Sequence, residues 1–263
     1  MTSTTVGMRC PECAKQRTRV VAMRGMTSVP RVTYALMAIN VIVYLAEGNL
    51  GLGAPSNTVF THGALLGSGS PEFLPGQGVA HGQWWRIVSS GFLHENIVHL
   101  GLNMWVLYLL GQMIEPALGP IKYVAVYAVS LLAGSLGALL LAPHALTVGA
   151  SGAIFGLMGA AAVEARSRHI SLAQSGLGGL ILINLVFSFT FSGISLGGHI
   201  GGLIGGVLAA LAIQLGDRRR SLVLALTACA LIGAAAIAGS VITSRSSDAG
   251  DASVAPALLT PGG

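Results

Sequence analysis

The feature that most constrains the fold is a series of seven long apolar segments, which leave little of the chain for other structure. Only 9% of the 263 residues are Asp, Glu, Lys or Arg, whereas soluble domains carry about 25%. Each segment is close to the ~20 residues that a helix needs to cross a bilayer, although two are short. We therefore predict an all-α polytopic membrane protein with seven spans, over residues 32–46, 97–114, 123–142, 151–163, 172–191, 196–215 and 222–242.

The lysines and arginines orient these segments, because cytoplasmic loops of membrane proteins are enriched in both residues. With the N-terminus in the cytoplasm, only Arg86 and Arg245 of the 14 basic residues fall outside. We therefore expect a multi-pass protein of the plasma membrane with a cytoplasmic N-terminus and an external C-terminus. Since the basic residues flank apolar spans, the net charge of +5 does not indicate nucleic-acid binding.

A long external connection, residues 48–92, separates the first two segments. Loops of this length are usually functional or disordered. The pair Trp84-Trp85 in this loop suits the interface between membrane and water. Anchoring at that interface would explain both tryptophans without any catalytic role.

Strongly polar side chains within the apolar segments are few, and they are candidates for a functional site because burying them in a bilayer is costly. No segment has Asp, Glu, Lys or Arg away from its ends. This pattern excludes a pair of membrane aspartates sharing a proton, and it leaves no lysine to activate a serine. The polar residues are His99, Asn103, Ser151, Asn184 and His199, with His94 just before the second segment.

Metal ligands are also poorly represented. The string from His94 to His99 is similar to the zinc motif H-E-x-x-H, which needs histidines at i and i+4. Here the spacing is i, i+5, which would put the two rings ~140° apart on a helix. Cys10 and Cys13 form a lone C-x-x-C, whereas a structural zinc site needs four ligands, and Cys229 lies in an apolar segment. We therefore expect no metal and no cofactor.

Ser151 lies in the turn Gly149-Ala150-Ser151-Gly152, where the fourth segment begins. Glycines allow a sharp turn and the close approach of a substrate. The free N–H groups of a helix N-terminus can stabilise an oxyanion formed beside the serine. An ordinary helix start built from small residues would have the same sequence, so this motif alone is weak.

His199 lies in a glycine-rich segment in which Gly198, Gly202 and Gly206 recur every four residues. Such a face lets two helices approach closely, and the fourth segment has a similar face that starts at Gly152. If the two faces meet, His199 reaches Ser151 at the same depth. The alternative is a histidine that only makes hydrogen bonds within a packed bundle.

His99 and Asn103 are at i and i+4, so they share one face of the second segment. Both side chains can donate hydrogen bonds, as an oxyanion hole requires. A polar clamp between two membrane helices is the alternative interpretation.

Together these motifs resemble those of rhomboid intramembrane serine proteases, in order, spacing and topology, over about residues 30–216. The resemblance implies a dyad of Ser151 as nucleophile and His199 as general base, with no acidic third member. It also implies that His99, Asn103 and the N–H of Ser151 hold the oxyanion. The matching motifs are Trp85-Arg86, His94-x4-His99-x3-Asn103, Gly149-Ala150-Ser151-Gly152 and Gly198-His199-Ile200-Gly201-Gly202.

The resemblance further implies several supporting residues. His94 would support the second span and the long loop, and Arg86 would form bonds within that loop. Phe155 would pack against the catalytic histidine, although many family members have Tyr there, so the hydrogen bond of that hydroxyl is missing. The other residues expected to support the site are Trp85, Gly149, Gly152, Gly198 and Gly202.

Four regions follow from this interpretation. Residues 31–216 would form a protease core of six transmembrane helices, and 217–243 an extra transmembrane helix. Residues 1–30 would be a cytosolic segment, whose C-x-x-C resembles the end of a cysteine-rich module carried by some actinobacterial rhomboids. Residues 244–263 are rich in Ser, Ala, Gly and Pro, which predicts a disordered tail.

The predicted function is cleavage of transmembrane segments of single-pass or polytopic membrane proteins, within the lipid bilayer, through an acyl-enzyme. A non-catalytic rhomboid-like protein that binds client helices is an alternative, but such proteins lack the serine or the histidine. A transporter is a second alternative, because broken helices and buried histidines also occur there. No inverted repeat is evident in the sequence.

Overall fold

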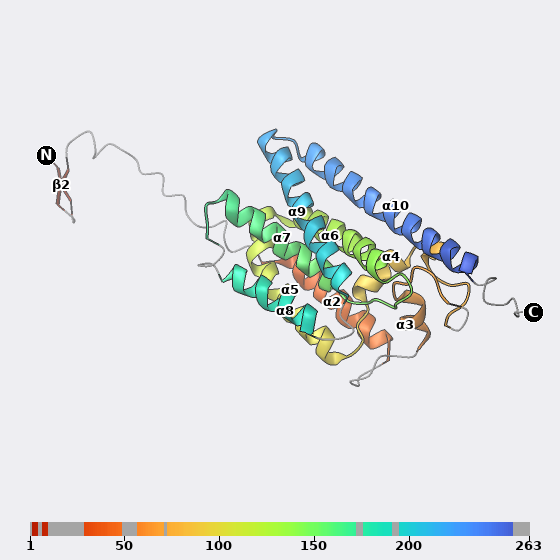
Figure 1. The fold of residues 1–263 in the computed structure, drawn as a ribbon. Helices are drawn as coiled ribbons and strands as arrows, with labels where there is room; N and C mark the ends of the chain where they lie inside the picture. The colour runs from red at the N-terminus through yellow and green to blue at the C-terminus, as the bar shows by residue number, and fades with distance from the viewer. Residues whose placement is uncertain are drawn as a thin grey trace, which may run out of the picture.

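The computed structural model describes residues 2–4, 7–9, 29–48, 57–70, 73–171, 176–190 and 195–254, which form a helical bundle with one long loop (Figure 1). The long helices are α2 (Arg31–Ala46), α5 (Ile97–Leu118), α6 (Pro120–Leu141), α7 (Ser151–Ser167), α8 (Leu177–Thr190), α9 (Leu196–Arg218) and α10 (Leu222–Val254). The short elements are the antiparallel strands β1 (Thr2–Thr4) and β2 (Gly7–Arg9), and α3 (Thr58–Gly63), η2 (Val79–His81), α4 (Arg86–Ser89) and η3 (Ser90–Phe92) in the long loop. Cys10 and Cys13 lie outside the described residues.

Four helices, α5, α6, α9 and α10, are long and apolar enough to cross a membrane. The other three long helices are shorter, with 16 residues in α2, 17 in α7 and 14 in α8. The prediction of a multi-pass helical membrane protein is thus confirmed. The predicted number of seven spans depends on three helices that fall short of the ~20 residues of a full crossing.

Helix α10 differs from the prediction, because it continues past residue 242 to Val254 instead of giving way to a tail at residue 244. Serine hydroxyls along this extension donate hydrogen bonds of 2.8–3.0 Å to carbonyl oxygens four residues earlier. These bonds keep the hydroxyls within the helix, so a serine-rich composition does not end it. Residues 255–263 lie outside the described residues.

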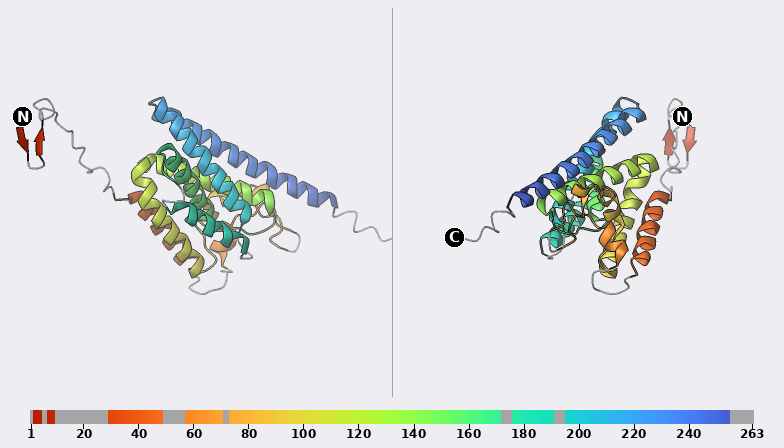
Figure 2. Two further views of the ribbon diagram at one scale, coloured as in Figure 1. Left: turned by 60° about the vertical axis from the view of Figure 1, so that its left-hand side comes forward. Right: turned by 90° about the vertical axis from the view of Figure 1, so that its right-hand side faces the viewer.

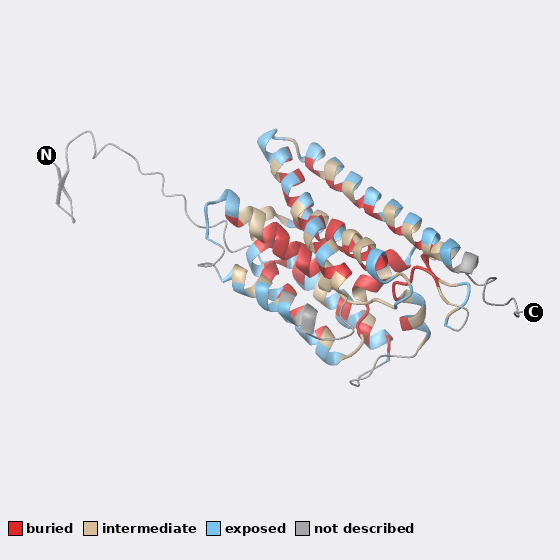
Figure 3. Cartoon of the chain, viewed as in Figure 1, coloured by how far each residue is buried: buried red, intermediate tan, exposed pale blue. Residues whose placement is uncertain are grey.

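Helices α6, α7 and α9 form the closely packed centre of the bundle, and α7 is buried along most of its length (Figure 3). The glycine faces of α7 and α9 lie against each other. A methyl group added to Gly202 would overlap the carbonyl oxygen of Gly152, and one added to Gly206 would overlap that of Gly156. Backbone-to-backbone contact of this kind is the reason that small residues mark helix interfaces in membranes.

Helix α10 lies along the outside of this centre, against α9 and α6 (Figure 2). Its C-terminal part reaches the long loop at η2. The loop itself packs on the bundle through α4 and η3, which contact α6 and α7. This arrangement places the loop at the end of the bundle where α7 begins.

Candidate active site

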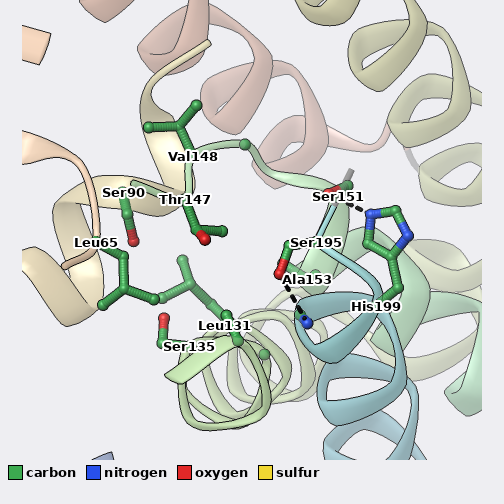
Figure 4. A pocket seen from close by; sticks show the side chains of 16 residues that line it. Leu65, Ser90, Leu131, Ser135, Thr147, Val148, Ser151, Ala153, Ser195 and His199 are labelled. Atoms are coloured by element: carbon green, nitrogen blue, oxygen red, sulfur yellow. Dashed lines mark hydrogen bonds between the residues drawn. The ribbon is translucent and has the colours of Figure 1, made fainter. Parts of the chain in front are cut away.

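Ser151 and His199 lie side by side at the starts of α7 and α9, although 48 residues separate them in the chain (Figure 4). The distance between Ser151 Oγ and His199 Nε2 is 2.7 Å, that of a hydrogen bond. The contact of Gly202 with Gly152 allows this approach, because neither helix has a side chain between the two backbones. The geometry permits the imidazole to accept the serine proton, as an activated serine requires.

The turn before Ser151 depends on Gly149, whose φ of +123° disfavours any other residue. Its N–H donates to the carbonyl of Ser90 at 2.9 Å, which ties the turn to the long loop. A Cβ at Gly149 would lie 2.8 Å from His99 Nε2 and 3.6 Å from Ser151 Oγ. The ring of His99 and the hydroxyl of Ser151 therefore face one small space, which a side chain at this position would fill.

Asn96 fixes the start of α5, because its side chain accepts a 2.9 Å hydrogen bond from the N–H of His99. Asn103 lies one turn after His99 in α5 and is buried. Its amide donates to the carbonyl oxygen of His99 at 3.1 Å. The structure thus brings the ring of His99 to the space beside Ser151, while Asn103 contacts the backbone of the same helix.

Phe155 lies one turn after Ser151 and stacks on His199, with ring centroids 4.2 Å apart and planes inclined by 16°. Both rings are buried. Stacking fixes the plane of the imidazole, and Nε2 in that plane lies 2.7 Å from the serine hydroxyl oxygen. A phenylalanine suffices for this contact, since it involves the ring faces alone.

His94 lies outside α5, because the helix begins at Ile97. The predicted separation of ~140° between His94 and His99 on a helix was therefore wrong, and the two rings meet edge to face at 5.1 Å. Burial lowers the pKa of His94 to about 3, and the neighbouring His99 adds to this effect, so His94 is neutral at pH 7. Within the described part of the chain, no three His, Cys, Asp or Glu side chains are grouped to hold a metal ion.

Glu47 also belongs to this polar cluster, and sequence reasoning missed it. Its carboxylate accepts a 3.2 Å hydrogen bond from the N–H of His94, and the residue is 1% exposed. Burial raises the pKa of Glu47 to about 7. The available signal was a single acidic residue directly after the first apolar segment.

Arg86 is fully buried within the long loop and makes side-chain hydrogen bonds to four residues of that loop. It therefore holds the loop segments together from inside. Trp85 exposes about half of its surface, at 54%, and its indole N–H donates to the carbonyl of His62 at 3.1 Å. The partners of Arg86 are Thr61 at 2.8 Å, Ala64 at 2.6 Å, Gln83 at 2.7 Å and Gln77 at 3.1 Å.

A small cavity opens beside Ser151, between the long loop and helices α6, α7 and α9 (Figure 4). Ser195 lines it and caps α9 by accepting a 3.1 Å hydrogen bond from the N–H of Gly198. The sequence contains a signal for this cap, since a serine directly before an apolar helix is a preferred N-cap. The rest of the wall needed the tertiary structure, and it includes Leu65, Ser90, Leu131, Ser135 and Thr147.

Comparison with known proteins gives the family. Residues 81–215, about half of the chain, match the Rhomboid domain. The chain is 34% identical to rhomboid protease GluP of Bacillus subtilis (strain 168) over 190 residues, which are 71% of this chain and 35% of that protein.

Two further relatives match shorter stretches. Rhomboid-like protease 3 of Toxoplasma gondii is 40% identical over 82 residues, 31% of each protein. Inactive RHOMBOID-like protein 8 of Arabidopsis thaliana is 32% identical over 107 residues, 41% of this chain and 30% of that protein. The chain spans about a third of the length of these relatives. The matched domain and these relatives together show that the chain belongs to the rhomboid family.

Proposed function

We propose that the chain is an intramembrane serine endopeptidase that cleaves transmembrane segments of membrane proteins. Rhomboid membership and the similarity to named rhomboid proteases support a peptidase. The observation that carries the proposal is the 2.7 Å contact between Ser151 Oγ and His199 Nε2 inside a helical membrane bundle. A serine with an adjacent base is the minimum requirement for an acyl-enzyme.

In the proposed reaction, His199 takes the proton of Ser151 while the serine oxygen attacks the scissile carbonyl. The negative charge that develops on the carbonyl oxygen would be held by His99, Asn103 and the N–H of Ser151. His99 Nε2 supports this role, since it faces the same space as the serine hydroxyl. The protonated His199 then protonates the leaving amine. In the second half of the reaction, His199 takes a proton from water as the water attacks the acyl-enzyme, and then returns the proton to Ser151.

The cavity beside Ser151 favours substrates with a small side chain next to the scissile bond, because it is narrow and bounded by small residues and two leucines. A substrate helix must also unwind before cleavage, since a helical carbonyl is already bonded and is not accessible to the serine. Small residues near the cleavage site would make this unwinding easier.

We further propose the arrangement of the chain in the plasma membrane. Helices α2 to α9 form the protease core, and α10 is an additional span. The N-terminus lies in the cytoplasm and the C-terminus outside, as the distribution of lysines and arginines favours. The active site and the long loop then face the outer leaflet, where water for hydrolysis is available.

The deciding experiment compares wild type with Ser151→Ala and His199→Ala, using a reporter transmembrane substrate in liposomes. Each substitution should lower kcat by at least about 1,000-fold, as removal of a nucleophile or its base does in serine proteases. Ser167→Ala is the matched control, since Ser167 is an exposed serine at the other end of α7 and should not affect cleavage. Retention of full activity by Ser151→Ala would overturn the proposal.

A second candidate function is the binding of client helices without cleavage, which the similarity to an inactive Arabidopsis relative keeps open. Under this hypothesis wild type would retain reporter helices but leave them intact. Ser151→Ala would then bind the same helices with unchanged affinity, and neither protein would yield a cleavage product.

A further inference from the structure

The C-terminal part of α10 is longer than a membrane crossing requires. At 33 residues the helix is about 50 Å long at ~1.5 Å per residue, whereas the hydrocarbon core is ~30 Å thick. The excess lies at the C-terminal end, where serines and Asp248 replace the apolar residues. Figure 1 shows this end beside the long loop.

Asp248 makes the polar contact between α10 and the loop. Its carboxylate accepts a 2.6 Å hydrogen bond from the hydroxyl of Ser68 and lies 3.8 Å from His81 Nε2. Ser68 is only 1% exposed, whereas the side chain of Asp248 is 42% exposed, so the bond joins a buried hydroxyl to a carboxylate at the surface. Hydrogen bonds to a carboxylate are stronger than neutral ones.

The segment that leads to Ser68 contributes Leu65 to the wall of the active-site cavity. Two hydrogen bonds hold the backbone of Ser68 to the connection between α6 and α7. Its N–H donates to the carbonyl of Pro143 at 3.3 Å, and its carbonyl oxygen accepts from Nδ1 of His144 at 3.1 Å. Three residues earlier, Leu65 and Thr147 exchange two backbone hydrogen bonds of 2.9 Å, and both residues line the cavity. Thr147 stands four positions before Ser151 in the chain.

We propose that Asp248 is a positioning residue for the active site. By holding Ser68, it fixes the long loop against the connection between α6 and α7, and thereby sets the width of the cavity beside Ser151. This gives α10 a role in substrate positioning although it contributes no residue to the cavity wall among the described residues. The kinetic part of this inference rests on the proposed protease function.

The first test measures the loop directly and needs no catalysis. In a Ser151→Ala background with the native cysteines replaced by alanine, Leu66→Cys provides a thiol at a residue with no exposed surface. Adding Asp248→Ala, which cannot accept the hydrogen bond of Ser68, should increase the labelling rate by a membrane-impermeant maleimide about tenfold, without lowering Tm. Asp217→Ala is the control, because it breaks a 2.5 Å ion pair with Lys122 away from the loop. Equal rates with and without Asp248→Ala, or the same increase with Asp217→Ala, would overturn the proposal.

The second test measures cleavage of the reporter by the protein with Ser151 intact. Asp248→Ala should lower kcat/KM about tenfold, mainly by raising KM, whereas Asp248→Glu, which keeps an acceptor for Ser68, should lose less. A structural role alone would lower Tm and leave KM unchanged, and that result would overturn the proposal. If Ser151→Ala still cleaved, the proposed function would fail while the labelling result would stand.

Discussion

Two buried glutamates at opposite ends of α2 have very different surroundings. At the start of the helix, the carboxylate of Glu115 from α5 accepts hydrogen bonds from the N–H of Val32 at 2.9 Å, and from the N–H and hydroxyl of Thr33 at 2.8 and 2.7 Å. At the end of the helix, Glu47 accepts one bond from His94, and its second oxygen has no partner among the described residues. We call the first region the Glu115 end and the second the site end.

We infer from this difference that the Glu115 end stabilises the fold, whereas the site end belongs to the polar cluster beside the proposed active site. Glu115 satisfies free N–H groups of the first turn of α2, which otherwise would cost free energy on burial. The site end instead holds polar groups that are packed but incompletely bonded, including Tyr44 Oη and Glu47 Oε2. A buried polar group without a partner calls for an explanation, and a role in a nearby site is one. Substitutions at the two ends should therefore change different quantities.

The largest effect is expected when the helices that carry the site are forced apart. Gly202→Val would place a side chain against the carbonyl of Gly152, and this backbone cannot move without moving Ser151. We expect a loss of about 3 kcal/mol in unfolding free energy, with loss of cleavage, measured by Tm and reporter assay. Gly101→Ala is the control, since nothing lies within 4 Å of a Cβ at that residue. A stable and active Gly202→Val protein would contradict the close packing of α7 and α9.

Substitution of His99, the proposed oxyanion donor, should affect rate more than stability. His99→Ala should lower kcat about 100-fold, the usual effect of removing one oxyanion-hole donor, with KM changed little. Parallel measurements of kcat and Tm test this expectation. A large fall in Tm with unchanged kcat in the folded fraction would assign His99 to structure, as in a polar clamp between helices.

The Glu115 end should show the opposite behaviour. In Glu115→Gln, an amide NH2 replaces one of the two oxygens that face donors of α2, so a donor meets a donor. The unfolding free energy should fall by about 2 kcal/mol, while kcat/KM of the folded protein stays at the wild-type value. A large change in kcat/KM would remove the distinction between the two ends.

The smallest expected effect concerns pH and the site end. Since burial raises the pKa of Glu47 from 4.5 to about 7, the charged form destabilises the folded state as pH rises through this range. Glu47→Gln keeps the acceptor for His94 but cannot ionise, so it should raise Tm relative to wild type above pH 7. The gain should disappear below pH 4.5. A Tm difference that is independent of pH would contradict the raised pKa.

Local sequence patterns predict much of the fold and of the candidate site. The four-residue spacing of Gly198, Gly202 and Gly206 predicted a close helix contact, and the structure places Gly202 against Gly152. Apolar length identified the segments that became the long helices. The rule of spacing on a helix failed at His94, because His94 precedes the N-cap Asn96 and so lies outside α5.

Contacts between distant segments could not be predicted in this way. The four partners of Arg86 come from positions in the long loop that have no periodic pattern. The extension of α10 was missed because its composition is polar, and its contact with the long loop joins Asp248 to Ser68, 180 residues away. Glu47 was missed because only the fold brings it to His94.

The central claim is that His199 activates Ser151, and covalent labelling tests it most directly. A fluorophosphonate probe reacts with serines that have an adjacent base, and mass spectrometry then locates the modified residue. We predict modification at Ser151 alone in the folded protein, and its loss in His199→Ala at unchanged Tm. No modification of Ser151 in wild type, or equal modification in His199→Ala, would contradict the claim.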